Sequence, residues 1–129
     1  MPEQQKTSIL ILDDEPIVSQ RLKPSLEKQG YEVETFTASL DALKRTREKT
    51  FDIVITDLKM EGLDGMGFLG KVKEKSPATE VIVITGFATM ETAKESFQKG
   101  VFDFLAKPFK MGEIIAAIKK AEQKIKQTL

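Results

Sequence analysis

Several residue types are missing from this chain, and each absence excludes a class of chemistry. The 129 residues contain no cysteine and no histidine. Disulfides, thiolate sites, Ser-His catalysis, haem ligation and the usual zinc sites are therefore excluded. Any chemistry must rely on carboxylates, lysines and hydroxyls, so a bound metal would be a hard cation such as magnesium, manganese or calcium.

An excess of charge of one sign is also missing, and so is any long apolar segment. The 20 basic and 20 acidic side chains cancel without forming a block of like charges, which argues against direct binding to nucleic acid. No apolar run approaches the length that crosses a bilayer, and residues 1–7 are polar rather than a secretion signal. We therefore expect a cytoplasmic protein that does not bind membranes.

Short apolar runs recur along the chain and predict buried strands. They lie at residues 9–12, 53–55 and 81–84, and at 101–106 with one interruption. A fifth strand is indicated at 31–36, where apolar and acidic residues alternate in a way that suits the edge of a sheet. Helical stretches separate the strands, which predicts an α/β fold with parallel strands and helices on both faces of one sheet.

The ends of the helices are visible as well. Pro16 suits the first turn of a helix that runs towards Gly30. Candidate N-caps precede three further helices: Ser39, Asp64 and Thr89. A last helix from about Met111 carries an apolar stripe of Ile114, Ile118, Ala121 and Ile125. Pro24 predicts a kink in the first helix, and three glycines predict a late start or fraying of the third: Gly65, Gly67 and Gly70.

Polar residues stand where the predicted strands end. Asp13 and Asp14 follow the first strand, Asp57 the third, Thr85 the fourth and Lys107 the fifth. Any one of them alone is more often a turn former or a helix cap. Because ligands bind outside the carboxyl ends of the strands in a doubly wound sheet, the whole set predicts a binding site.

The chemistry of these groups narrows the role of the site. Three crowded carboxylates repel one another, so a divalent cation and the Lys107 ammonium are needed to offset their charge. Oxygen ligands suit Mg²⁺, which makes it the expected cofactor. Asp57 ends a central strand and is the candidate nucleophile. Phosphoryl transfer requires mainly positioning and charge neutralisation, which the metal, Lys107, the Thr85 hydroxyl and loop amides can supply.

Four motifs give the sequence a family resemblance. They are Ile-Leu-Asp-Asp-Glu at 11–15, Ile-Thr-Asp-Leu-Lys-Met at 55–60, Ile-Thr-Gly at 84–86 and Phe-Leu-Ala-Lys-Pro-Phe at 104–109. From residue 9 to about 125 the chain resembles the receiver domain of bacterial response regulators. The stretch from Thr85 to Phe109 looks closest to receivers attached to sigma-54-type transcriptional activators, which would make this a phosphoprotein of transcription regulation.

The resemblance implies a fold and a role for each site residue. The fold would be a flavodoxin-like, three-layer, doubly wound sheet of five parallel strands in the order 2-1-3-4-5. The domain would span residues 7–129 after a tail at 1–6, with no output domain following. Asp57 would be the phosphoacceptor, and the metal ligands would be Asp13, Asp14, Asp57 and the Lys59 backbone carbonyl. Thr85 and Lys107 would contact the phosphoryl oxygens, Phe104 would be the switch aromatic, and the Lys107-Pro108 bond would be cis.

The resemblance also implies a two-component signalling function. A histidine kinase or phosphotransfer protein would supply the phosphoryl group, and the domain would catalyse only its own phosphorylation and dephosphorylation. Thr85 would move towards the phosphoryl group, and Phe104 would turn into the space that it leaves. The surface of the fourth helix, fifth strand and fifth helix would then control an output domain, a downstream protein or a phosphorylation-linked homodimer.

Some positions depart from the family pattern or have a plainer expected role. Glu61 replaces a proline that receivers often carry, and Lys59 and Phe87 occupy positions that tune dephosphorylation in the family, so the phosphoryl lifetime is not predictable. Four phenylalanines are expected in the core: Phe51, Phe68, Phe97 and Phe102. The lysines of the last helix are expected to form a solvated face: Lys119, Lys120, Lys124 and Lys126.

Three alternatives to a receiver domain stay open from the residues. A small aspartate-nucleophile phosphohydrolase of the haloacid-dehalogenase type also uses aspartate, magnesium and lysine, but it needs a second aspartate two residues after its nucleophile, and Lys59 stands there. A flavodoxin-like flavin-binding module needs a phosphate-binding first loop, whereas Asp14 and Glu15 make this loop acidic. An unphosphorylated scaffold is the third alternative.

Overall fold

The computed structural model describes residues 6–59 and 64–127. Its strands are β1 (Ser8–Leu12), β2 (Glu32–Phe36), β3 (Ile53–Thr56), β4 (Glu80–Thr85) and β5 (Asp103–Ala106). Its helices are α1 (Pro16–Lys28), α2 (Ser39–Glu48), α3 (Gly65–Lys75), α4 (Met90–Gln98) and α5 (Met111–Gln127). Among these described residues no helix is both long and apolar enough to span a bilayer.

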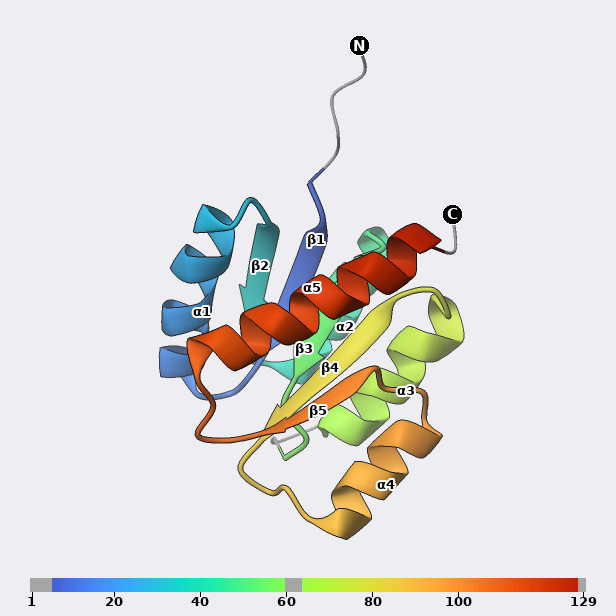
Figure 1. Cartoon of the computed structure of the whole chain (residues 1–129). Coiled ribbons are helices and arrows are strands. Elements are labelled where there is room, and N and C mark those ends of the chain that lie inside the picture. The colour runs from blue at the N-terminus through green and yellow to red at the C-terminus, as the bar shows by residue number, and fades with distance from the viewer. Residues whose placement is uncertain (1–5, 60–63, 128–129) are drawn as a thin grey trace.

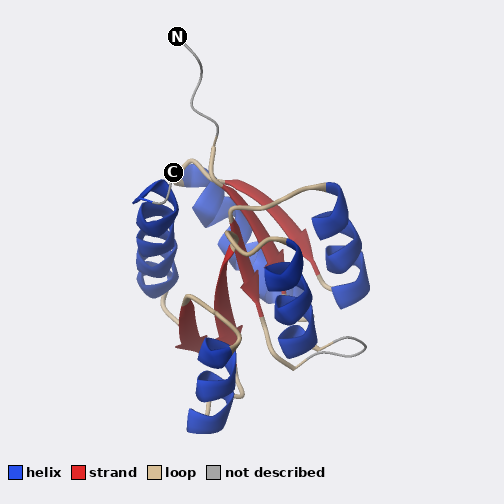
Figure 2. Cartoon of the chain, turned by 90° about the vertical axis from the view of Figure 1, so that its right-hand side faces the viewer, coloured by secondary structure: helices blue, strands red, loops and turns tan. Residues whose placement is uncertain are grey.

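The five strands form one parallel sheet in the order β2-β1-β3-β4-β5, as the sequence predicted (Figure 1). Helices lie on both sides of the twisted sheet, with the C-terminal helix α5 on one side of it (Figure 2). The sheet with its two helical layers is the predicted three-layer α/β fold. β2 is an edge strand, which confirms the interpretation of its alternating pattern.

Alternation of side chains along the strands divides the core into two layers. Isoleucines of the central strands pack with α1 and α5: Ile9, Ile11, Ile53, Ile55, Ile82 and Ile84. The residues between them face the other way and pack with α2 and α3: Leu10, Leu12, Val54, Val81 and Val83. Every residue of β1, β3 and β4 is buried. A strand covered on both faces reads as a continuous apolar run, which is why these strands were visible in the sequence.

Two of the three predicted N-caps are confirmed. The Asp64 carboxylate accepts a hydrogen bond from Gly67 N at 2.8 Å, and Thr89 forms a capping box with Thr92. The prediction for Ser39 is wrong. α2 begins at Ser39 itself, and the preceding Ala38 occupies the N-cap position without a side-chain hydrogen bond. Ser39 is buried, one residue too far into the helix to accept from its first amides.

The expected late start of the third helix is also wrong, because α3 begins at the first of its glycines. Gly65 lies against the backbone of Asp57, and a Cβ atom there would stand 1.6 Å from the Asp57 carbonyl oxygen. Gly65 N also donates to Leu58 O at 2.9 Å. Glycine is therefore required for this close approach, and it ties the start of α3 to the end of β3.

Helix α1 continues through Pro24, so this proline does not divide it into two helices.

The four phenylalanines that were expected in the core differ in how far they are buried. Phe51 and Phe68 are buried in the core as predicted, and Phe102 is half-buried. Phe97 is 50% exposed, so its assignment to the core is wrong. Phe97 belongs to α4, in which only Ser96 is buried, and α4 lies beside the edge strand β5 (Figure 1). The four lysines predicted for the solvated face of α5 are all exposed, although Lys124 also pairs with Glu80.

Candidate functional site

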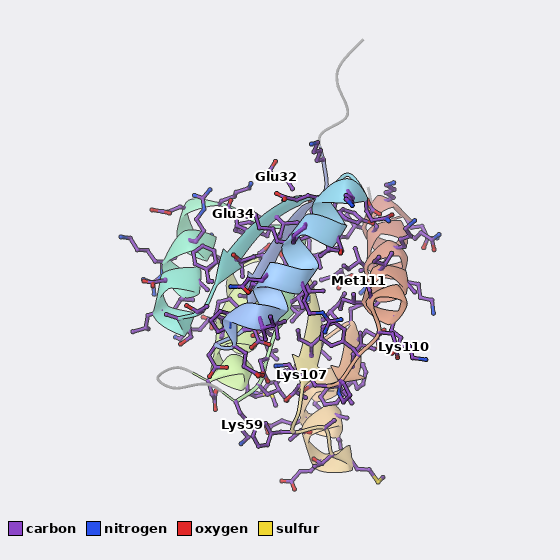
Figure 3. All side chains as sticks on the ribbon, turned by 90° about the vertical axis from the view of Figure 1, so that its left-hand side faces the viewer. Glu32, Glu34, Lys59, Lys107, Lys110 and Met111 are labelled. Atoms are coloured by element: carbon purple, nitrogen blue, oxygen red, sulfur yellow. The ribbon has the colours of Figure 1, made fainter. Side chains whose placement is uncertain are left out.

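The loops that follow the strands bring the predicted site residues to one edge of the sheet. Asp57 N donates to Leu12 O at 3.0 Å, and Lys107 N donates to Thr85 O at 2.8 Å. Each of these two residues therefore extends the hydrogen-bonded ladder by one step beyond its strand. Lys59 and Lys107 lie at the same end of the sheet, the end opposite Glu32 (Figure 3). Residues that are far apart in the sequence thus meet at the carboxyl ends of the strands.

Three aspartates form a compact acidic cluster. Asp13, Asp14 and Asp57 each offer one carboxylate oxygen, and these oxygens all lie within 4.8 Å of one another. Asp13 and Asp57 are buried and Asp14 is exposed. One Asp57 oxygen, Oδ1, accepts from the backbone amides of Leu58 at 2.6 Å and Lys59 at 3.4 Å. The other oxygen, Oδ2, faces the lysine of the site.

Lys107 joins the acidic groups through one ammonium. Its Nζ lies 2.7 Å from Asp13 Oδ2, 2.9 Å from Asp57 Oδ2 and 2.9 Å from Glu15 Oε1. The peptide bond between Lys107 and Pro108 is cis, as the family resemblance implied. Glu15 has no role in the sequence-based assignment. Its position directly after the acidic pair was the only signal, and an acidic residue in a loop is common.

Burial and charge act against each other at this cluster. Burial raises the pKa of Asp13 above its ordinary value, although the Lys107 ammonium and the Glu15 amide act to lower it. Burial acts to lower the pKa of Lys107, but its contacts with the three carboxylates outweigh that effect and raise it. Lys107 is therefore a firmly held cation at neutral pH.

The donor atoms of the cluster fit a hard divalent cation. All of them are oxygens, which Mg²⁺ prefers. Asp13 Oδ2 is buried and, within the described residues, accepts no hydrogen bond of good geometry even though Lys107 Nζ lies 2.7 Å away. A buried carboxylate oxygen with spare capacity is a suitable ligand for a cation, because coordination would replace the missing hydrogen bond.

The two predicted switch residues lie on one face of the sheet but are not joined to the acidic cluster. The buried Thr85 hydroxyl accepts from Phe87 N at 3.0 Å, and no hydrogen bond links it to Asp57 in the described part of the chain. Val83 aligns with Phe104 across the β4–β5 ladder. Because side chains alternate, Thr85 and Phe104 project from the same face. Phe104 is half-buried against the core layer of α2 and α3.

Two features of the site stay predictions. The Lys59 side chain is exposed and its amide lies near Asp57 Oδ1, while the metal-binding role of its carbonyl stays a prediction. Glu61 lies outside the described residues, so the effect of the missing proline stays a prediction as well.

The fold and the acidic cluster are those expected of a receiver domain, and a family comparison agrees. The model of the response regulator receiver domain matches residues 9–119. This chain therefore belongs to the response regulator receiver family, as the four sequence motifs indicated. The family assignment supports the receiver over the phosphohydrolase and flavodoxin alternatives.

The relatives are transcriptional regulators of the expected kind. The transcriptional regulatory protein ZraR of Salmonella typhimurium is 33% identical over 95% of this chain, and the DNA-binding transcriptional regulator NtrC of Escherichia coli is 30% identical over 91%. The chain spans only 28% and 25% of these two proteins. These relatives confirm the likeness to receivers of sigma-54-type activators.

A solved receiver structure agrees with both the sequence and the fold. The solution structure of the beryllofluoride-activated NtrC4 receiver domain dimer is 34% identical in sequence, with a TM-score of 0.87. It covers 92% of this chain, and this chain covers 98% of it.

Proposed function

We propose that Asp57 accepts a phosphoryl group from a histidine kinase or a phosphotransfer protein, with Mg²⁺ as the cofactor. The observation that carries this proposal is the clustering of the Asp13, Asp14 and Asp57 oxygens within 4.8 Å, with the Lys107 ammonium 2.9 Å from Asp57. The domain extends over residues 7–129, after a tail at residues 1–6.

Each group of the site has a distinct task in the transfer. An Asp57 oxygen forms a bond to phosphorus while the bond from phosphorus to the donor breaks, and the donor leaves with that electron pair. Lys107 neutralises charge on the phosphoryl oxygens, and the Leu58 amide orients Asp57 through Oδ1 at 2.6 Å. Mg²⁺ would be held by Asp13, Asp14, Asp57 and the Lys59 carbonyl, and would supply further charge neutralisation.

Phosphorylation then changes the surface of α4, β5 and α5. The Thr85 hydroxyl leaves Phe87 N for a phosphoryl oxygen, and Phe104 turns inward on the face that the two residues share. A few kcal/mol of differential contact is enough to shift such an equilibrium. α4 is suited to present the signal, because three apolar residues on it or just before it are exposed: Phe87, Met90 and Phe97.

This surface contacts an output domain, a downstream protein or a second copy of the chain. The likeness to the activated NtrC4 receiver, which is a dimer, supports a phosphorylation-linked homodimer. We expect no direct contact of this chain with nucleic acid, because its 20 basic and 20 acidic residues balance and form no block of like charges. The protein acts in the cytoplasm, where the kinase would donate its phosphoryl group, and it catalyses no reaction other than its own phosphorylation and dephosphorylation.

The proposal is tested by mass spectrometry of the intact chain after incubation with acetyl phosphate and Mg²⁺. We expect one phosphoryl group, mapped to Asp57, and none in Asp57→Asn. Asp64→Asn is the matched control, because it changes another carboxylate near the same edge and asparagine also caps helices. It should be labelled like the wild type.

Equal labelling of Asp57→Asn and the wild type would refute the assignment of the phosphoacceptor. Sustained hydrolysis of small phosphate esters over many turnovers would instead indicate a phosphohydrolase. Failure of the wild type to bind Mg²⁺ would favour an unphosphorylated scaffold.

A further inference from the structure

The Lys107 ammonium has one partner that the proposed phosphoryl transfer does not use. Its side chain is 15% exposed and contacts Asp13, Asp57 and Glu15 at 2.7, 2.9 and 2.9 Å. Asp13 and Asp57 belong to the acidic cluster, whereas Glu15 does not. The Glu15 side chain is 60% exposed, so it reaches the ammonium from the solvent side of the site.

The lysine and a divalent cation would share two of the same carboxylates. Lys107 lies against Asp13 Oδ2 and Asp57 Oδ2, and both aspartates offer oxygens to the candidate cation site. An ammonium that rests firmly on both oxygens opposes cation binding, because the two positive charges repel each other. Glu15 is outside the acidic cluster and can keep its contact with Lys107 when the aspartates are engaged.

The backbone holds Glu15 in a position from which it can do this. Glu15 N donates to Asp13 Oδ1 at 2.9 Å, and Glu15 O accepts from Val18 N at 3.1 Å. Glu15 occupies the N-cap position of α1 and is followed by Pro16, yet its side chain makes no capping hydrogen bond. The side chain is thus free to extend to Lys107, while the backbone remains tied to the Asp13 loop.

We propose that Glu15 is a positioning residue that draws the Lys107 ammonium towards the outer side of the acidic cluster. This inference rests on the proposed function, since it assigns Glu15 a part in preparing that site. With Glu15 in place, Lys107 leaves the aspartate oxygens to the cation and still remains beside Asp57 for the phosphoryl group. Without Glu15, Lys107 settles on Asp13 and Asp57 alone and hinders cation binding.

A double-mutant cycle on Mg²⁺ affinity tests the proposal. Titration calorimetry on the full chain, without a phosphoryl donor, compares the wild type, Glu15→Gln, Lys107→Met and the double variant. Glu15→Gln should weaken Mg²⁺ binding by about fivefold when Lys107 is present, the upper range for an exposed ion pair. In the Lys107→Met background the same change should have an effect of about twofold or less, because only a screened, exposed charge is lost.

The control variant is Glu74→Gln, which removes an exposed carboxylate near the far end of α3. It should leave Mg²⁺ affinity unchanged, which shows that net charge alone is not responsible. An equal effect of Glu15→Gln in both Lys107 backgrounds would overturn the inference, because Glu15 would then act only through its charge. Failure of the proposed function has a separate signature, the absence of phosphoryl label on Asp57 in the wild type.

Discussion

Both ends of the sheet hold carboxylates, and two at the amino end, Asp52 and Glu122, differ in their partners from those at the carboxyl end. At the amino end Glu122 accepts from the hydroxyls of Thr7 and Tyr31 at 2.7 and 2.9 Å, one donor for each oxygen. Asp52 likewise accepts from the amide and the hydroxyl of Ser8. Both carboxylates have neutral donors of their own. Glu122 thereby joins α5 to the start of β1, and Asp52 joins the residue before β3 to the same place.

At the carboxyl end three carboxylates instead share one ammonium. Asp13, Glu15 and Asp57 all contact Lys107 Nζ. The buried Asp13 keeps an oxygen without a good hydrogen bond. The same type of side chain thus stabilises the fold at one end and leaves capacity for a cation and a phosphoryl group at the other. The difference lies in the number and kind of donors, not in the residue type.

The largest effect on stability is expected at the carboxyl end of the sheet, at a position where close packing matters rather than charge. Gly65→Ala would place a Cβ atom 1.6 Å from the Asp57 carbonyl oxygen, so the backbone that presents Asp57 must shift. We expect a loss of about 3 kcal/mol in the free energy of unfolding. Urea denaturation followed by circular dichroism measures it.

Gly70→Ala in the same helix is the matched control. Nothing lies within 4 Å of a Cβ atom at Gly70, so alanine should stabilise α3 by about 1 kcal/mol. Equal stability of the two alanine variants would show that the contact between α3 and the end of β3 is not needed.

An intermediate effect is expected at the amino end. Glu122→Ala removes the acceptor of both Thr7 and Tyr31, and should lower the free energy of unfolding by about 2 kcal/mol. Gln123→Ala, at an exposed position one residue further along α5, should change it little. A loss no larger than that of the control would mean that Glu122 is not a structural carboxylate.

The Tyr31 phenol, at the same amino end of the sheet, makes stability depend on pH. Burial, followed by the hydrogen bond to Glu122, raises the pKa of Tyr31 from 10.0 to about 12. Because the folded value is the higher one, this contribution to stability is complete below about pH 10 and is lost between about pH 10 and 12. Tyr31 is the only tyrosine and the chain has no tryptophan, so phenolate absorbance reports this group alone. In Glu122→Ala the pKa should fall but stay above 10, since burial remains.

The smallest effect on stability is expected for the crowded carboxylates, and it is an increase. Asp13→Asn removes a buried carboxylate whose pKa is raised by burial. The new amide oxygen can still accept from Glu15 N. We expect the free energy of unfolding to rise by about 1 kcal/mol without Mg²⁺. Thermal unfolding should also show that Mg²⁺ no longer stabilises this variant. A fall in stability would mean that the ion pair with Lys107 outweighs the cost of burying Asp13.

Several features of the fold could be predicted because they are local. Strands covered on both faces appear as apolar runs, and Asp64 and Thr89 cap helices through amides only three residues away. Ser39 and Phe97 were assigned wrongly because their surroundings are set by other segments. The start of α2 differs by one residue from the expected one, and α4 buries only Ser96 against the rest of the domain.

The sequence by itself determined the parallel α/β class and the placing of Asp13, Asp57 and Lys107 at the strand ends, because side-chain periodicity and chain direction are local properties. Only the tertiary structure brought Glu15 to Lys107, which is 92 residues away, and Gly65 against the backbone of Asp57. Contacts of that kind depend on how the loops pack against one another. The periodic pattern of apolar residues in the sequence does not encode such packing.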